Sequence, residues 1–194
     1  MASKLRPLAK AYATWIEELE NRRTAEADLA NYKEASAQVV ARARELLARL
    51  NDGIALLDTN QDARQAFSFA NRAMWQQRIR SVWIEERKEE PSRQLSEVDI
   101  PQNRSWRAFQ LAFILINLPG LTSLDHPDRD TSSFAGADLL WFPTGGGKTE
   151  AYLGLAAYTI AIRRLQKNIG GRDGENGVAV LMRYTLRLLT LQQF

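Results

Sequence analysis

The string Phe142-Pro-Thr-Gly-Gly-Gly-Lys-Thr149 constrains the fold more than any other feature of the sequence. Three consecutive glycines let the backbone curl so that several N–H groups point at one anion. A helix beginning near Lys148 adds the positive end of its dipole at the same point. The lysine can reach the β- and γ-phosphates of a nucleotide, and the Thr149 hydroxyl can ligate Mg²⁺. We therefore expect an ATP site with Mg²⁺ in which Lys148 and Thr149 are catalytic and the contacts come from Pro143, Thr144, Gly145, Gly146, Gly147, Lys148, Thr149 and Glu150.

The segments on both sides of the glycine string predict a βαβ unit. Residues 137–142 (ADLLWF) and 177–183 (GVAVLMR) are apolar runs of the length of a buried strand. Residues 150–165 between them have a helical composition. Strand, helix and strand in this order predict a parallel sheet with a right-handed crossover, and Trp141 on the first strand is expected in the core.

The first half of the chain predicts helices instead. Apolar residues recur at helical spacing within residues 5–19, 39–57 and 61–88, with Gly53 as a weak point and Thr59 and Asn60 as a cap for the third helix. Residues 106–118 predict a short helix stopped by Pro119, and residues 119–136 a loop. We therefore divide the chain into a helical region (1–90), a linker (91–103) and the first part of a nucleotide-binding domain (104–194), an α region followed by an α/β domain.

Composition excludes several kinds of site. The chain has no cysteine and a single histidine, His126, so disulfides, thiolate catalysis and cysteine- or histidine-based metal sites are not expected. No uncharged run reaches the length of a membrane span, which predicts a soluble, cytoplasmic protein without a membrane partner. Residues 101–194 hold 10 basic and 7 acidic side chains, so the whole net charge of +3 lies there and suits a phosphate-bearing partner.

Two further groups of side chains can be interpreted either as functional sites or as ordinary surface and core residues. Asp125, His126, Asp128 and Asp130 could hold a metal ion, but a solvated loop is favoured because their spacing matches no metal cage. Basic and aromatic residues alternate between Arg72 and Lys88, as on a surface that stacks nucleic-acid bases. A helix with core tryptophans and a charged outer face is the preferred interpretation of that stretch.

The glycine string resembles the phosphate loop of superfamily 2 helicases of the DEAD/DEAH type, in which the position of Phe142 need not be glycine. Upstream, Trp106-Arg-Ala-Phe-Gln-Leu111 looks like the element of these motors that recognises adenine. The resemblance implies that Gln110 binds the adenine edge and that Arg107 orients the loop, although Ala108 replaces the usual proline.

A third stretch, Tyr184-Thr-Leu-Arg-Leu-Leu-Thr-Leu-Gln-Gln193, is similar to the family segment that grips a nucleic-acid backbone. The resemblance implies that Thr185, with Arg183 or Arg187, contacts nucleic acid, with DNA as the first choice. Residues 104–194 together resemble the DrmA-type helicase subunits of the DISARM anti-phage defence systems. That resemblance implies a RecA-like ATPase domain, ATP-dependent helicase or translocase activity in phage defence, and other defence-system subunits as partners.

Such motors also need an acidic Mg²⁺-holding box on a later strand and a second RecA-like domain with an arginine finger. After Thr149 the only acids are Glu150, Asp173 and Glu175, and none ends a predicted strand. We therefore expect the N-terminal part of a larger motor, able to bind nucleotide but incomplete as an ATPase, with the remainder of the motor as its partner. Two alternatives stay open: a non-catalytic helical interaction module with a remnant phosphate-loop fold, and a P-loop phosphotransferase.

Overall fold

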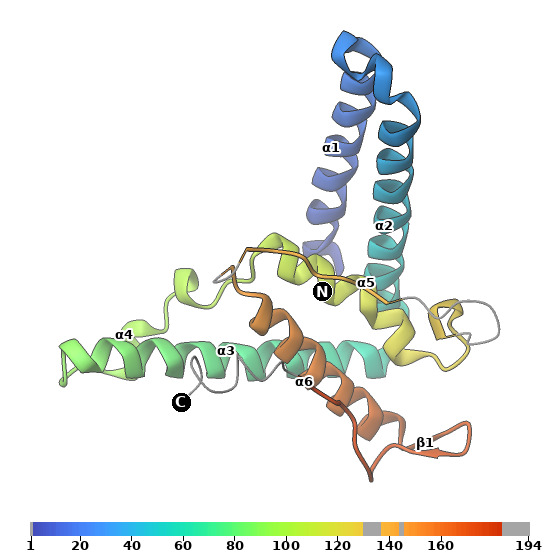
Figure 1. Ribbon diagram of the computed structural model, residues 1–194. Coiled ribbons are helices and arrows are strands. Elements are labelled where there is room, and N and C mark those ends of the chain that lie inside the picture. The colour runs from blue at the N-terminus through green and yellow to red at the C-terminus, as the bar shows by residue number, and fades with distance from the viewer. Residues whose placement is uncertain (1, 130–136, 144–145, 184–194) are drawn as a thin grey trace.

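The computed structural model describes residues 2–129, 137–143 and 146–183, and helices make up most of this part of the chain (Figure 1). The long helices are α1 (Arg6–Ala25), α2 (Lys33–Thr59), α3 (Gln61–Glu89), α5 (Ala108–Thr122) and α6 (Lys148–Gln166). The short elements are α4 (Leu95–Val98) and the 3-10 helices η1 (Ala2–Lys4), η2 (Ala27–Tyr32), η3 (Pro101–Asn103) and η4 (Pro127–Arg129).

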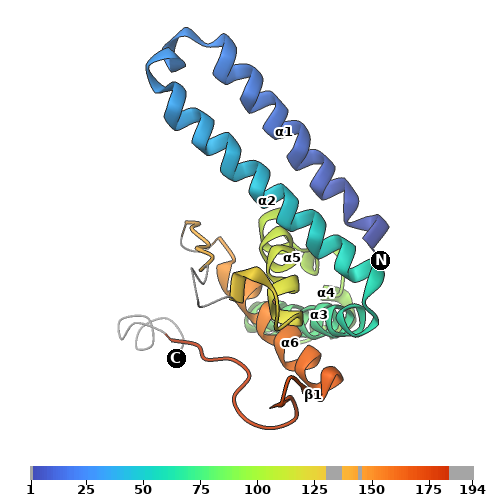
Figure 2. The ribbon, with the colours of Figure 1, turned by 90° about the vertical axis from the view of Figure 1, so that its right-hand side faces the viewer.

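Helices α1 and α2 form a hairpin arm that projects from the rest of the molecule (Figures 1 and 2). A small cluster of Ile16, Val40 and Ala43 is buried between the two helices. Helix α1 continues through the polar residues up to Ala25, and η2 follows it. The polar sequence there is compatible with helix because the tip of the arm is solvated on most sides.

The base of the arm crosses α5 at Gly53. A Cβ atom on Gly53 would lie 2.0 Å from the backbone oxygen of Leu115. Pro119 lies four residues after Leu115, inside α5, and does not end the helix. It has no N–H to donate to the Leu115 oxygen. The helix thus continues three residues past the predicted stop. Gly53, predicted to be a weak point of its helix, is the residue that allows α2 to approach this free carbonyl.

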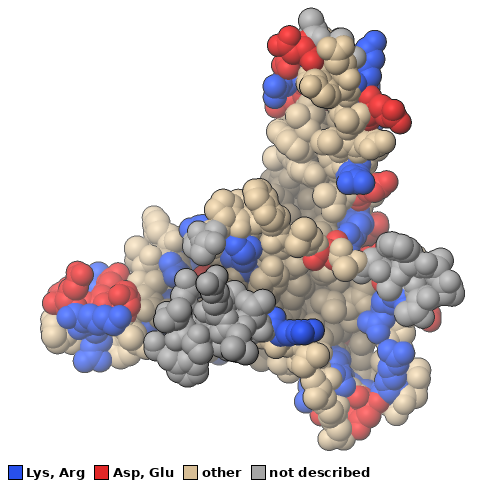
Figure 3. All heavy atoms as spheres, in the orientation of Figure 1, with Lys and Arg blue, Asp and Glu red and all other residues tan. Residues whose placement is uncertain are grey.

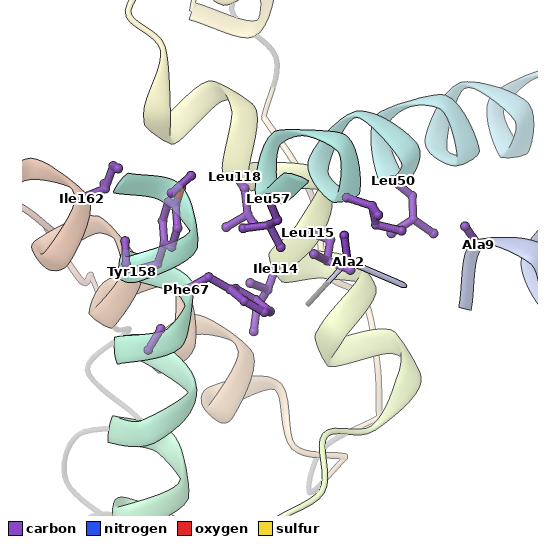
Figure 4. Close-up of a cluster of buried hydrophobic side chains, with 14 residues drawn as sticks. Ala2, Ala9, Leu50, Leu57, Phe67, Ile114, Leu115, Leu118, Tyr158 and Ile162 are labelled. Carbon is purple, nitrogen blue, oxygen red and sulfur yellow. The ribbon is translucent and has the colours of Figure 1, made fainter. Parts of the chain in front are cut away.

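The main core lies where α2, α3, α5 and α6 meet (Figure 4). Its largest fully buried side chains include Tyr158, Leu57, Ile114 and Leu115. The Tyr158 hydroxyl lies 2.6 Å from the Thr122 hydroxyl, which itself donates to the Leu118 carbonyl at 2.7 Å. Tyr158 is therefore the donor of this pair, and burial raises its pKa to about 12. At its N-terminus α3 is capped as expected, because the Asn60 side chain accepts a hydrogen bond from the Ala63 amide.

The predicted parallel sheet is wrong. Over residues 2–129, 137–143 and 146–183 the only strands are β1 (Asn168–Ile169) and β2 (Arg172–Asp173), an antiparallel pair with Asn168 opposite Asp173. Residues 137–143 and 177–183 belong to no strand, so the described chain contains no βαβ unit and no start of a RecA-like domain. Only the crossover helix was predicted correctly, as α6. The helix predicted from Thr185 lies outside the described residues.

The physical reason is that neither apolar run pairs with a neighbouring strand in the described structure, and the largest side chains at their centres are exposed. Leu139 is 87% exposed and Leu181 is 89% exposed. Trp141, expected in the core, is 82% exposed. A strand is stabilised by hydrogen bonds to a neighbouring strand, and the interior here is filled by helices instead.

Candidate functional site

The glycine string ends at the N-terminus of α6. Gly147 is the N-cap residue, with a left-handed φ of +89°, and no side chain among the described residues caps the helix. The first backbone N–H groups of a helix have no partner within it, so an uncapped terminus keeps them available. Lys148 is the first residue of α6, and the Thr149 side chain beside it is exposed. This terminus is the part of the molecule suited to an anion.

Two side chains from the start of α5 hold the carbonyl groups of the loop. The Arg107 guanidinium donates to the Gly146 oxygen at 2.6 Å, and the Gln110 amide donates to the Gly147 oxygen at 2.7 Å. The Gln110 side-chain oxygen accepts from the Arg107 backbone N–H at 2.9 Å. Gln110 is only 5% exposed. The structure thus brings the predicted adenine element to the loop, and both ends of the Gln110 amide are bonded within the protein.

Lys148 folds back over its own loop. Its ammonium donates to the Phe142 carbonyl and, at 3.1 Å, to the Pro143 carbonyl. The Phe142 ring stacks on Phe109 of α5, with ring centroids 4.0 Å apart and planes 11° apart. A Cβ atom on Gly146 would lie 2.7 Å from the Phe142 ring. Phe142, which stands where the general motif has glycine, therefore anchors the loop to α5 by its ring.

An ion pair from the arm holds the chain that leads into the loop. Both terminal nitrogens of Arg49, on α2, donate to the Asp138 carboxylate at 2.7 Å. A second carboxylate, that of Asp128, lies 3.2 Å from Arg49. The side-chain hydrogen bond to Asp138 is the main cause that raises the pKa of Arg49, and the negative charges of Asp138 and Asp128 add to it. This pair was not predicted, since no local pattern connects residues 89 positions apart.

A groove of about 960 Å³ opens beside the loop, and we call it the arginine–tryptophan groove. It runs from Gly147 and Glu150 along Gln110 to α3 and the chain around η3. Its side chains include Arg72, Trp75 and Arg78 of α3, together with Arg104, Trp106 and Arg107. Glu150 faces it from α6, and its Oε2 is buried without a hydrogen-bond partner among the described residues. The alternation on α3 was visible in the sequence, but a plain charged helix face was the preferred interpretation.

The remaining predicted site residues are placed as follows. Arg183 is exposed and is the last residue described. Thr144, Gly145, Thr185 and Arg187 lie outside the described residues, as does Asp130. Of the proposed acidic cluster, Asp128 pairs with Arg49, and the His126 ring accepts a hydrogen bond from the Asp128 backbone N–H at 3.2 Å. The described residues contain no group of three or more His, Cys, Asp or Glu side chains placed to hold a metal.

The sequence was compared with known proteins. It is 43% identical over 195 residues to the DISARM protein DrmA of Bacillus paralicheniformis. The chain resembles DrmA. The match covers 98% of this chain but 16% of the relative, so the chain spans about a sixth of the length of DrmA. No protein-family profile matches the sequence. Within the described part of the chain, no helix is both long and apolar enough to cross a membrane.

Proposed function

We propose that this chain is the nucleotide-binding part of a DrmA-like, ATP-dependent helicase or translocase that acts in phage defence. One observation carries the proposal: an uncapped helix N-terminus, α6, is presented by a glycine loop whose carbonyls are held by Arg107 and Gln110. Because those carbonyls are held by side chains, they are kept from turning toward an anion, while the α6 amides stay available. The similarity to the DISARM protein DrmA supports the phage-defence part of the proposal.

Lys148 and Thr149 have distinct roles in the proposed site. The Lys148 ammonium now binds two neutral carbonyls, and a polyphosphate is a stronger, charged acceptor for the same donor. The exposed Thr149 hydroxyl and the neighbouring Glu150 carboxylate supply oxygen donors of the kind that Mg²⁺ prefers. With so few protein oxygens, these residues fit a Mg²⁺ ion that is held mainly by nucleotide phosphates and water. Bound there, Mg²⁺ would neutralise phosphate charge.

Removing the lysine tests this function. We expect Lys148→Ala to lower the affinity for Mg·ATP by about tenfold or more, because the variant lacks a charge-assisted hydrogen bond to the phosphates. Isothermal titration calorimetry on the folded chain measures the change. Lys10→Ala, which removes an exposed lysine from α1, is the matched control and should bind as the wild type does. Equal affinity in wild type and Lys148→Ala would show that the loop does not bind nucleotide.

The proposed partners follow from the same relation. We propose that the longer protein acts on DNA, that Arg183, Thr185 and Arg187 contribute to that contact, and that other DISARM subunits associate with it. The rest of the motor would supply the acidic box and the arginine finger that catalysis requires. The hairpin arm of α1 and α2 favours docking of a partner subunit as a second role, because it projects away from the nucleotide site (Figure 1).

A further inference from the structure

The arginine–tryptophan groove carries one further inference, which concerns Trp75. On α3, Arg72, Trp75 and Arg78 follow one another at intervals of three residues, and all three line the groove. Side chains three apart lie on neighbouring turns of one helix face. The groove therefore has an aromatic ring flanked by two guanidinium groups along its α3 wall.

The positive charges of the α3 wall are not paired with acidic side chains of the described residues. In the described part of the chain, neither Arg72 nor Arg78 forms an ion pair, whereas Arg104 across the groove pairs with Asp99 at 2.8 Å. Of the groove-lining residues, Glu150 alone is acidic, and it lies at the α6 end. A groove with this balance attracts an anionic ligand. In Figure 3, Lys and Arg side chains are spread over several parts of the visible face, and Asp and Glu side chains lie among them.

The Trp75 ring is fixed in place before any ligand arrives. Its indole N–H donates to the Asp99 carboxylate at 2.8 Å, and the Arg104 guanidinium lies 5.2 Å from its ring centre. Arg104 donates to the same Asp99 oxygen at 2.8 Å. The residue Trp75 is still 39% exposed while it lines the groove. A preorganised, half-exposed indole is a stacking surface for a planar ring.

Gln110 is poorly placed to bind a base. Its oxygen and its amide nitrogen already bond Arg107 and Gly147, and its side chain is almost fully buried. Freeing the Gln110 amide for a base would release the Gly147 carbonyl. The residue that the sequence suggested for base recognition therefore braces the loop in this structure.

We propose that the arginine–tryptophan groove is the nucleoside end of the nucleotide site, and that Trp75 stacks on the base. This inference rests on the proposed binding of phosphate at the N-terminus of α6. The groove begins at Gly147 and Glu150, beside that terminus, so a nucleotide with its phosphates on the loop can extend its base along the groove toward Trp75. Arg72 and Arg78 add positive charge that favours the polyanion, and Trp75 selects ligands that carry an aromatic ring.

Comparing two ligands separates these contributions. We expect Trp75→Ala to weaken Mg·ATP binding at least about fivefold, which is the lower end of the loss expected when one base–aromatic stack is removed. Binding of tripolyphosphate should be unchanged, because this ligand has no base. Trp75→Phe, which keeps an aromatic ring, should retain most of the ATP affinity. Trp15→Ala is the matched control, because Trp15 is similarly exposed but lies on the arm, and it should change neither affinity. Titration calorimetry with both ligands measures all four proteins.

Different results would overturn the proposed phosphate site and the proposed role of the groove. If Lys148→Ala weakens ATP binding and Trp75→Ala does not, the base lies elsewhere and the groove proposal is overturned while the phosphate site stands. If Trp75→Ala weakens tripolyphosphate as much as ATP, Trp75 does not act on the base and the groove proposal is also overturned. If a short single-stranded oligonucleotide, but not ATP, loses affinity in Trp75→Ala, the groove binds a strand instead and the nucleoside assignment is wrong. Insensitivity of both ligands to Lys148→Ala would overturn the phosphate site itself.

Discussion

At the scale of single residues, the contact between Gly53 and the Leu115 carbonyl is the tightest constraint on how the arm joins the core. A methyl group on Gly53 would overlap backbone atoms, at 2.0 Å from the Leu115 oxygen and 2.8 Å from its carbon. Backbone atoms cannot move aside as a flexible side chain can. The higher helix propensity of alanine, worth about 1 kcal/mol, is therefore outweighed by the cost of separating two packed helices.

We expect Gly53→Ala to lower the free energy of unfolding by about 1–3 kcal/mol or more, because α2 must shift away from α5. Urea denaturation followed by circular dichroism measures the change. Gly120→Ala is the matched control: Gly120 lies inside α5, and its added Cβ would meet nothing closer than 3.6 Å. That variant should be neutral or slightly stabilised. A neutral Gly53→Ala would mean that α2 and α5 do not cross this closely in solution.

At the scale of elements, α5 connects the arm to the glycine loop. Its middle packs against Gly53 of α2, and its first turn holds the loop through Arg107, Phe109 and Gln110. Arg49 provides a second connection, from α2 to Asp138. Residues 137–143 have no secondary structure of their own, so their position depends on the side chains at their two ends, Asp138 and Phe142.

The Arg49–Asp138 pair should therefore behave as a positioning contact. We expect Arg49→Asp to destabilise the chain by about 1–3 kcal/mol, since a charge-assisted bidentate pair becomes a repulsion between partly buried carboxylates. Adding Asp138→Arg to it should recover part of the stability and part of the Mg·ATP affinity. Thermal unfolding and calorimetry of the single and double variants form the cycle.

The control for this cycle is Arg44→Asp. Arg44 lies on the same helix, is more exposed, and approaches Glu20 only at 3.5 Å, so a destabilisation within about 1 kcal/mol is expected. If the reversed pair recovers neither stability nor affinity, the Arg49–Asp138 contact does not position the loop.

At the scale of the whole molecule, the charge distribution decides how the chain meets nucleic acid. The net charge is only +3, and its excess lies in residues 101–194. The tip of the arm carries both signs, including the pairs of Glu20 with Arg23 and of Arg22 with Glu26. A nucleic acid is thus expected around the glycine loop, and not on the arm.

We expect weak, sequence-independent binding of single-stranded DNA that falls steeply as salt is raised, because counterion release drives it. Arg183→Ala with Arg187→Ala should weaken binding equally for all sequences and reduce the salt slope by about 1 for each arginine that binds a phosphate in the wild type. Fluorescence anisotropy across a salt series measures both. Arg22→Ala with Lys33→Ala, on the arm, is the charge-matched control. DNA binding that does not respond to salt would argue against a backbone-phosphate interaction.

The helices and the local character of the loop follow from nearest-neighbour patterns in the amino-acid sequence. Helix stripes predicted the cores of α1, α2 and α3, and a helical composition predicted α6, because each backbone hydrogen bond of a helix joins residues four apart and the pattern is local. The glycine string likewise predicted a helix beginning near Lys148, where α6 begins, because the conformational freedom of glycine belongs to the residue itself.

The contacts that each segment makes with the rest of the protein depend on how the helices pack. The apolar runs at 137–142 and 177–183 have the composition of buried strands, but a strand needs a remote neighbour, and here Leu139 and Leu181 are exposed. The pairing of Arg49 with Asp138 and the placing of Trp75 in one groove with Gly147 join residues far apart in the chain. No local pattern specifies such contacts, because they follow from how the helices pack: α2 on α5 at Gly53, and α3 on α6 around Tyr158.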